Sequence, residues 1–207
     1  MLFRSLDNPV TVREDEIRES EKENGFCWWV DQITRPYLRC RSLLAYHLSD
    51  LGEVEEAAAH RRALLRICRR DNPGNRVPLA GWLCVQSKDD PAALVELGVL
   101  LMQYQMDPIA PLLYCRALYL FRDGNKKMAD EMLQRAISAN PLVSTILCGY
   151  SKILFPKKTM RRGSNEEASE YLLYAMEAWR EKDVSAWLLE QFRNTLRQFI
   201  SEGEPQE

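Results

Sequence analysis

The residues best suited to metal binding or nucleophilic chemistry are two histidines and six cysteines. His47 and His60 fall on consecutive predicted helices, but no carboxylate or cysteine near them has the spacing of a metal ligand. The cysteines are widely spaced and form no CxxC pair: Cys27, Cys40, Cys68, Cys84, Cys115 and Cys148. Cys68 has arginine neighbours that favour a reactive thiolate, but it shares an apolar helical stripe with Leu64. That position favours a core residue.

Other catalytic patterns are missing from the sequence. It contains no glycine-rich phosphate loop and no nucleophile elbow, and its nine glycines are scattered. Glu166 and Glu167 suit the positive N-terminal end of a helix better than an acid/base pair. We therefore expect a protein that is not an enzyme and that holds no metal and no cofactor.

Two clusters of basic residues have two open interpretations. One cluster is Arg61, Arg62, Arg66, Arg69 and Arg70, and the other is Lys157, Lys158, Arg161 and Arg162. Each is either a solvated surface or a site that binds an acidic peptide or RNA phosphates. The net charge of −2 gives no global basic field, and few aromatic residues interleave with the clusters. Nucleic acid is therefore the less favoured partner.

The composition is that of a folded protein, with 46% hydrophobic and 28% charged residues among 207. No apolar run approaches the ~18–20 residues that span a bilayer, so we expect no membrane partner. The first residues lack the long apolar segment of a secretory signal. We therefore expect reduced cysteines and a cytoplasmic protein, with the nucleus as the alternative location.

A helical-hairpin repeat supplies the elements that position these residues. Its best copy runs over 112–141, where Gly124 reverses the chain and Pro141 ends the second helix. Small residues at Ala117, Ala129 and Ala136 allow two antiparallel helices to approach closely. This is the pattern of the tetratricopeptide (TPR) hairpin, whose period is about 34 residues.

The same period predicts two earlier hairpins. The first pairs 34–50 with 53–70 and turns at Gly52, with Leu44, Ala45 and Leu48 on the inner side of its first helix. The second pairs 77–86 with 91–103 and turns near Lys88, where Asp90 caps a helix that begins with Pro91. The third hairpin pairs 109–122 with 125–139, and a short helix follows over 142–150. Ser164 or Asn165 caps the next helix, which carries Ala168 to Trp179, and a last helix runs over about 184–200.

We expect one helical repeat domain over 26–200, between a polar arm at 1–25 and an acidic tail at 201–207. The fold class is all-α: a TPR-like right-handed superhelix of about three hairpins with a C-terminal helical pair. Phe26, Trp28 and Trp29 form an aromatic cluster in front of the first hairpin. This cluster either caps the array or serves as a binding hot spot, including one for self-association.

The repeats resemble the TPR superfamily, although Arg69 replaces the expected proline of the first hairpin and the second lacks a turn glycine. Over 28–190 the chain is also similar to bacterial and fungal TPR-like proteins related to the suppressor-of-tumorigenicity-seven family. The stretches that carry this likeness are at 34–39, 51–57, 71–76, 139–143, 167–171 and 177–180. The resemblance implies a helical repeat fold and no catalytic residues.

In a TPR array, the first helices of successive hairpins line a concave groove. This register gives partner-binding candidates in each hairpin: Arg39, Ser42, Tyr46, Asn75, Trp82, Gln86, Tyr114, Phe121 and Arg122. For the aromatic candidates Tyr46, Trp82 and Tyr114, a core position remains the alternative. The leading hypothesis is an adaptor that holds a peptide or helix of another protein in this groove. The alternative is an RNA-associated helical repeat protein that uses the basic clusters.

Overall fold

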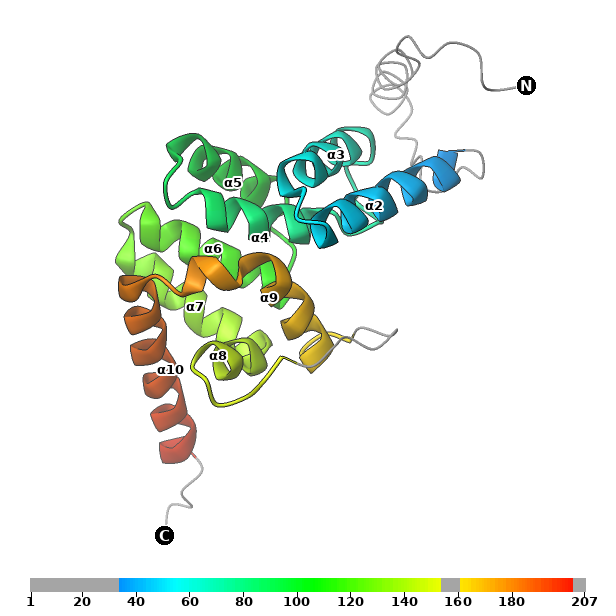
Figure 1. Ribbon diagram of the computed structural model, residues 1–207. Helices are drawn as coiled ribbons and strands as arrows, with labels where there is room; N and C mark the ends of the chain where they lie inside the picture. The colour runs from blue at the N-terminus through cyan, green and yellow to red at the C-terminus, as the bar shows by residue number, and fades with distance from the viewer. Residues whose placement is uncertain (1–33, 154–160, 203–207) are drawn as a thin grey trace, which may run out of the picture. The chain divides into compact units, whose positions relative to one another are not determined.

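A computed structural model describes residues 34–153 and 161–202, with side chains described up to residue 197 (Figure 1). Over these ranges every regular element is an α-helix and none is a strand, which confirms the all-α class. None of the helices in these ranges is long and apolar enough to cross a membrane. Several predictions fall outside the described residues: the 1–25 arm, the cluster of Phe26, Trp28 and Trp29, Lys157 and Lys158, and most of the acidic tail.

The chain divides into two compact units, Met1–Arg76 and Val77–Glu207. The predicted repeat domain over 26–200 therefore spans both units. Unit 1 packs around Leu38, Leu64, Ile67 and Cys68, whereas unit 2 has an aromatic core of its own. Each unit can accordingly be understood from its own contacts.

Unit 1 is a helical hairpin of α2 (Thr34–Asp50) and α3 (Val54–Ile67), which contact one another along their length (Figure 1). Gly52 makes the turn with φ +84°, a conformation that strains residues with a Cβ. The prediction that Leu44 faces inward is wrong, because Leu44 is exposed. The buried positions of α2 include Leu38 and Ala45, and the side chain before Ala45 points about 100° away from it.

A short link follows α3 and leads into α4 (Arg76–Gln86). Asp71, buried and at φ +47°, accepts hydrogen bonds from the backbone nitrogens of Asn75 and Arg76, both at 2.8 Å. Its carboxylate also forms an ion pair with the Arg76 guanidinium at 3.0 Å. Burial raises the pKa of Asp71, and the hydrogen bonds from Arg76 and Asn75 oppose that rise. The segment between α3 and α4 is thus a polar, hydrogen-bonded link.

Unit 2 begins with the remaining predicted hairpin helices. After α4 come α5 (Pro91–Gln103), α6 (Ala110–Arg122) and α7 (Lys126–Ala139). Asp90 caps α5 by accepting a hydrogen bond from the Ala92 backbone nitrogen at 2.8 Å, and Pro91 opens the helix, both as predicted. The helices that the period predicted around Lys88 are therefore present.

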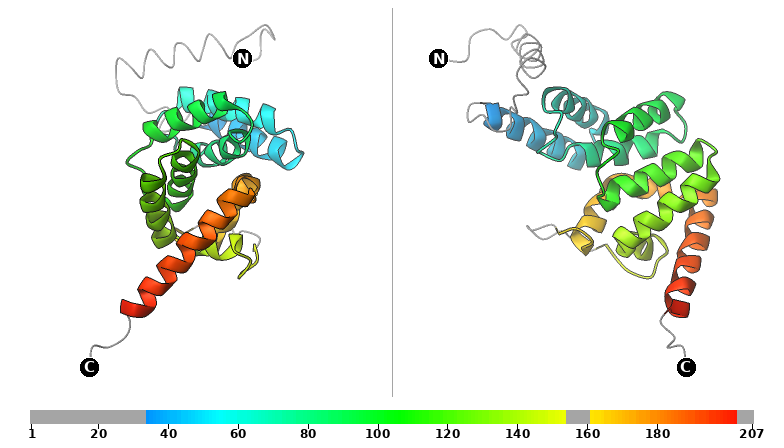
Figure 2. Two further views of the ribbon diagram at one scale, coloured as in Figure 1. Left: turned by 90° about the vertical axis from the view of Figure 1, so that its left-hand side faces the viewer. Right: turned by 180° about the vertical axis from the view of Figure 1, so that it is seen from behind.

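The hairpin that fits the predicted repeat pattern best is the pair of α6 and α7. Figure 2 shows the two helices side by side, joined by a turn in which Gly124 has φ +83°. Ala129, Leu133 and Ala136 of α7 are fully buried, as their spacing predicts. Ala117 of α6 is also fully buried, so small side chains lie on both helices of this hairpin.

Three further helices complete unit 2: α8 (Pro141–Leu147), α9 (Asn165–Trp179) and α10 (Lys182–Glu202). Pro141 is the first residue of α8, and Asn140 caps that helix by accepting a bond from the Leu142 backbone nitrogen at 3.1 Å. Helix α10 packs against α7, α8 and α9, while α9 packs against α6 and α8 (Figure 2).

An aromatic core joins α6, α9 and α10. The ring of Tyr114 stacks on Tyr171 at 5.9 Å and meets the edge of Trp179 at 5.8 Å. Trp187 stacks on both Trp179, at 6.2 Å, and Phe121, at 4.4 Å. The closing helices α9 and α10 therefore cover the side of α6 that holds Tyr114 and Phe121.

Candidate protein-interaction faces

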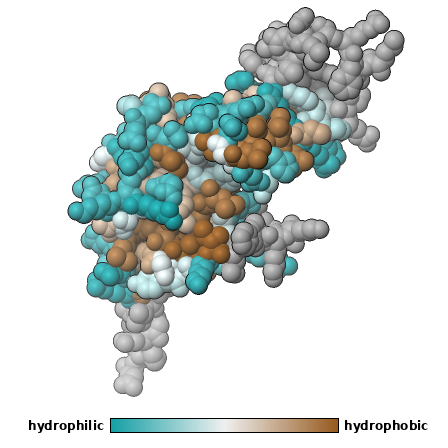
Figure 3. Space-filling model, in the orientation of Figure 1, coloured by the Kyte–Doolittle hydropathy of each residue, from teal (hydrophilic) through white to brown (hydrophobic). Residues whose placement is uncertain are grey.

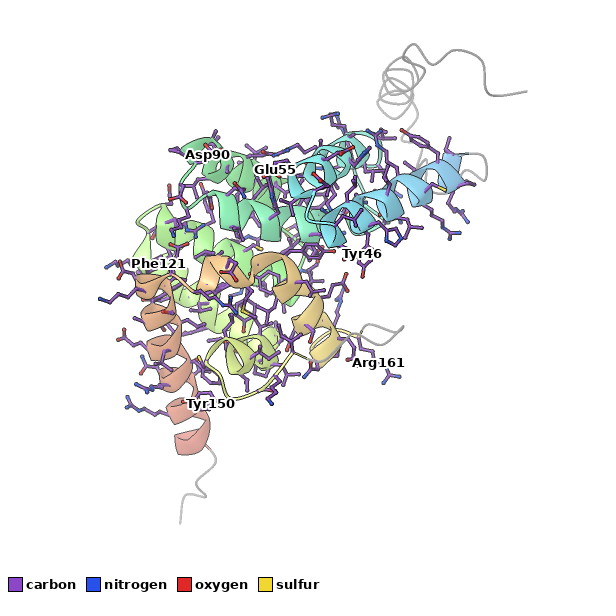
Figure 4. All side chains as sticks on the ribbon, viewed as in Figure 1. Tyr46, Glu55, Asp90, Phe121, Tyr150 and Arg161 are labelled. Carbon is purple, nitrogen blue, oxygen red and sulfur yellow. The ribbon has the colours of Figure 1, made fainter. Side chains whose placement is uncertain are left out.

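In unit 1, two of the predicted contact residues lie on the surface. Arg39 is exposed, and Tyr46, which projects from α2 in Figure 4, is 44% exposed. Ser42 is half-buried, and its hydroxyl donates to the Asn75 side-chain oxygen at 3.2 Å. Asn75 itself is buried, so it holds the link to α2 in place instead of meeting a partner.

Arg39 and Tyr46 lie on one side of α2 together with a further exposed apolar residue, Leu43. We call these three residues the α2 face. Tyr37 and Leu44 are also exposed but lie on another side of the helix, and exposed Leu51 is in the turn after it. Leu43, at 56% exposure, lies four residues after Arg39 and three before Tyr46, a spacing that puts the three on one side of the helix. In Figure 3 a hydrophobic patch is visible over the first hairpin.

In unit 2, the predicted contact residues are mostly built into the packing. Trp82 and Gln86 are half-buried on α4. Phe121, at the end of α6 in Figure 4, is half-buried and stacks on Trp187. Tyr114 is fully buried, and its hydroxyl hydrogen-bonds to the Asn140 carbonyl oxygen at 3.0 Å and to the Ser144 hydroxyl at 2.8 Å. Tyr114 is therefore a core residue, and its assignment as a contact residue is corrected.

Arg122 also has a packing role. Its guanidinium donates to the Cys84 carbonyl oxygen, to the Ser87 hydroxyl at 2.6 Å and to the Glu181 carboxylate. Only 9% of the Arg122 side chain is exposed. The guanidinium thus links the end of α4 to the start of α10. Because its hydrogen bonds are made within the unit, little of the Arg122 side chain is accessible to a partner.

The predicted groove residues are divided between the two units. Arg39, Ser42, Tyr46 and Asn75 belong to unit 1, whereas Trp82, Gln86, Tyr114, Phe121 and Arg122 belong to unit 2. Within unit 1 the structure brings Ser42 and Asn75 together and leaves Arg39 and Tyr46 exposed. Of the predicted partner-binding groove, the part that is exposed on unit 1 is the α2 face.

The basic clusters are smaller than the sequence suggests. Arg61 is buried, and its guanidinium donates to the Ala45 carbonyl oxygen at 3.2 Å, so it joins α3 to α2 and is not a surface cation. Arg62 is half-buried, while Arg66, Arg69 and Arg70 are exposed. Arg161 and Arg162 are exposed just before α9, where Figure 4 labels Arg161.

In the described chain, His60 and the buried cysteines are part of the packing, whereas His47 and Cys40 are exposed. The Arg41 Nε donates to Nδ1 of His60 at 3.2 Å, and the Glu56 carboxylate lies 3.9 Å from its Nε2. Burial, followed by the charge of Arg41, lowers the pKa of His60, while Glu56 opposes the change. Among the described residues, no group of three or more potential ligands could hold a metal ion. Cys68, Cys84 and Cys115 are buried and form no disulfide, and burial raises the pKa of Cys84 well above its usual value.

A second exposed apolar surface lies on α5, and the groove register did not include it. Its members, which we call the α5 face, are Val95, Val99 and Met102 of the helix and Met106 in the turn that follows it. A sequence signal was present, because α5 contains Glu96 as its one charged residue and has apolar side chains around its whole circumference. Such a helix is normally buried on every side, whereas α5 is not.

Comparison with known proteins adds no identification: no family model, no curated protein and no solved structure matches this chain. The resemblance to the TPR superfamily and to the suppressor-of-tumorigenicity-seven family therefore depends on the residue pattern alone.

Proposed function

We propose that the protein is a non-enzymatic adaptor, built from TPR-like helical hairpins, that binds a segment of another protein. Two features of the repeat support this proposal. The turn glycines Gly52 and Gly124 have nearly the same φ, +84° and +83°. Fully buried alanines lie on the paired helices, with Ala45 and Ala57 in the first hairpin and Ala117 and Ala129 in the third. Arrays of such hairpins are commonly binding scaffolds.

The α2 face is the observation that carries the proposal. The exposed side chains of Leu43 and Tyr46 lie one turn apart on the same side of the helix, and neighbouring exposed apolar residues can mark an interaction site. Tyrosine suits binding hot spots because it offers a large apolar ring with a polar hydroxyl. Arg39 lies on the same side of α2 and offers a cation at its edge.

The residues of the α2 face indicate what the partner segment contains. The segment would be a helix or an extended peptide, with apolar side chains that contact Leu43 and Tyr46 and a carboxylate that contacts Arg39. A charge at the rim of an interface mainly affects the association rate and its dependence on salt. The apolar residues would therefore contribute most of the affinity.

The test uses two triple variants of the full chain. The first changes the α2 face: Arg39→Glu, Leu43→Glu and Tyr46→Ala. The matched control makes the same exchanges at exposed positions of unit 2: Arg197→Glu, Leu173→Glu and Tyr150→Ala. Arg122 is left unchanged because its ion pair would confuse binding with stability. A partner bound by wild type and control, but lost from the folded α2-face variant, supports the proposal.

For the alternative function of RNA binding, the exposed cations include Arg66, Arg69, Arg161 and Arg162. Arg61 is buried and cannot contribute. This alternative predicts RNA binding that weakens steeply as the salt concentration rises and that is lost in the double variant Arg66→Glu with Arg69→Glu. If that double variant lost binding while the α2-face variant kept it, the adaptor proposal would be replaced.

A further inference from the structure

Helix α5 has two apolar sides, and its own unit covers one of them. Its inner side consists of Ala93, Leu97, Leu100 and Leu101, which are buried. The helix contacts α6, and at Gly98 it approaches so closely that a Cβ would lie 2.9 Å from the Tyr119 ring. This contact accounts for the inner side and leaves the α5 face unexplained.

More than half of each side chain on the α5 face is exposed. The exposed fractions are 67% for Val95, 64% for Val99, 68% for Met102 and 88% for Met106. The successive separations of four and three residues place Val95, Val99 and Met102 in one line about 10 Å long on α5, and exposed Met106 lies in the turn after the helix. That spacing is the one by which two helices pack along a shared seam.

The charges near this line include more acids than cations. Between residues 77 and 107 the sequence has one cation, Lys88, and four acids: Asp89, Asp90, Glu96 and Asp107. A second cation, Arg116 of α6, lies at the end of α5, where its guanidinium donates to the Leu101 and Tyr104 carbonyl oxygens, both at 3.3 Å. Asp89 and Asp90 are exposed in the turn before α5, where Figure 4 labels Asp90, and Glu96 directly follows Val95. An occupant with acidic flanks would be repelled here, whereas one with basic flanks would be attracted.

We infer that the α5 face binds an amphipathic helix of another protein, with a heptad-spaced apolar seam flanked by lysine or arginine. Long basic side chains can lay their methylene stems on Val95 and Val99 while their charges approach the acids. The two methionines adapt to differently shaped apolar side chains, which suits a helix-binding surface. This site lies in unit 2 and is separate from the α2 face, so it does not depend on the proposed adaptor site.

Two synthetic helical peptides with the same leucine seam test the inference, one with lysine flanks and one with glutamate flanks. Fluorescence anisotropy with the full chain should show the lysine peptide binding at least about tenfold more tightly. The double variant Val99→Glu with Met102→Glu should weaken that binding by about tenfold or more. Both positions are exposed on a helix, so circular dichroism should show a retained fold. The control variant Leu173→Glu changes an exposed side chain of α9 in the same unit, and it should bind the lysine peptide as tightly as wild type.

Several results would overturn the inference. Equal binding of the two peptides would remove the charge argument, and unchanged binding by the double variant would remove the site. A dimer in size-exclusion chromatography that Val99→Glu dissolves would make a second copy the occupant. Slower hydroxyl-radical oxidation of Met102 and Met106 than of exposed Met128 would show that the chain covers this face itself.

Discussion

At the residue scale, Tyr114 shows why exposure is harder to predict than helix position. The repeat register places it correctly on the first helix of the third hairpin, where TPR arrays carry contact residues. Its burial depends on α8 and α9, which lie 30 or more residues along the chain and supply Ser144 and the ring of Tyr171. No local pattern around Tyr114 contains that information, and burial raises its pKa above the usual value.

The exchange Tyr114→Phe should lower the free energy of unfolding by about 1–2 kcal/mol, since the Asn140 carbonyl and the Ser144 hydroxyl lose a buried partner. Tyr46→Phe, on the exposed α2 face, should leave stability nearly unchanged. Urea denaturation of both variants measures the difference. Equal stabilities would contradict the core assignment of Tyr114.

Arg122→Ala should cost about 3 kcal/mol of stability, because it leaves Glu181 and the Cys84 carbonyl without their guanidinium partner. The matched control is Arg180→Ala, whose ion pair with Glu177 has side chains more than 60% exposed. Exposed pairs typically contribute less than about 1 kcal/mol. Denaturation curves that shift equally for both variants would refute the packing role of Arg122.

His60 should make stability depend on pH below neutrality. Its pKa in the folded chain lies below the usual 6.5, so the unfolded chain binds the proton more readily. Stability from this group is complete above pH 6.5 and is lost as the pH falls through the lower, folded pKa. Burial is the main cause of this lowered pKa; the charge of Arg41 on α2 lowers it further, and Glu56 on α3 opposes the change.

Melting temperatures at about pH 7.5 and about pH 5.5 measure this effect. The wild type should lose more on acidification than His60→Gln, whose amide oxygen can still accept from Arg41. His47→Gln, in the same hairpin, is the matched control and should lose as much as the wild type. An equal loss in the His60 variant would show that this histidine does not couple to folding.

At the element scale, local signals predict where helices begin and end. Pro91 with Asp90 marks the start of α5, and Ser164 caps α9 by accepting from the Glu167 backbone nitrogen at 3.2 Å. These signals act within a few residues, so the sequence contains them in full. The side that each helix buries depends on its neighbours in space, which is why Leu44 and the α5 face were missed.

Two glycines inside helices test how closely the elements of unit 2 pack. At Gly81 of α4, a Cβ would lie 2.8 Å from the Tyr174 Cβ and 3.3 Å from its backbone carbon on α9. Gly81→Ala should therefore destabilise by about 1–3 kcal/mol, despite the better helix propensity of alanine.

Gly98→Ala is the comparison, because its Cβ would meet the far end of the Tyr119 side chain, which can rotate away. It should cost clearly less than Gly81→Ala in the same chemical denaturation series. If Gly98→Ala were the more damaging exchange, the account of the contact between α4 and α9 would be wrong.

At the scale of the whole molecule, the period of the turns predicts the order of the helices along the described chain. The division at Arg76 and Val77 was not predicted, since it depends on which helices contact one another. The proposed adaptor site uses the α2 face that unit 1 exposes, and the separate helix-binding site uses the α5 face that unit 2 exposes. Both faces consist of side chains that α-helical packing within the unit leaves uncovered.

The most direct test is affinity purification from the native cell, with quantitative mass spectrometry of what each form of the protein retains. Wild type, the α2-face triple variant and the unit 2 control triple would be compared, each confirmed as helical by circular dichroism. The account predicts a protein retained by wild type and control and depleted at least about tenfold by the α2-face variant. Equal retention by all three folded proteins would contradict the claim that this face holds a partner.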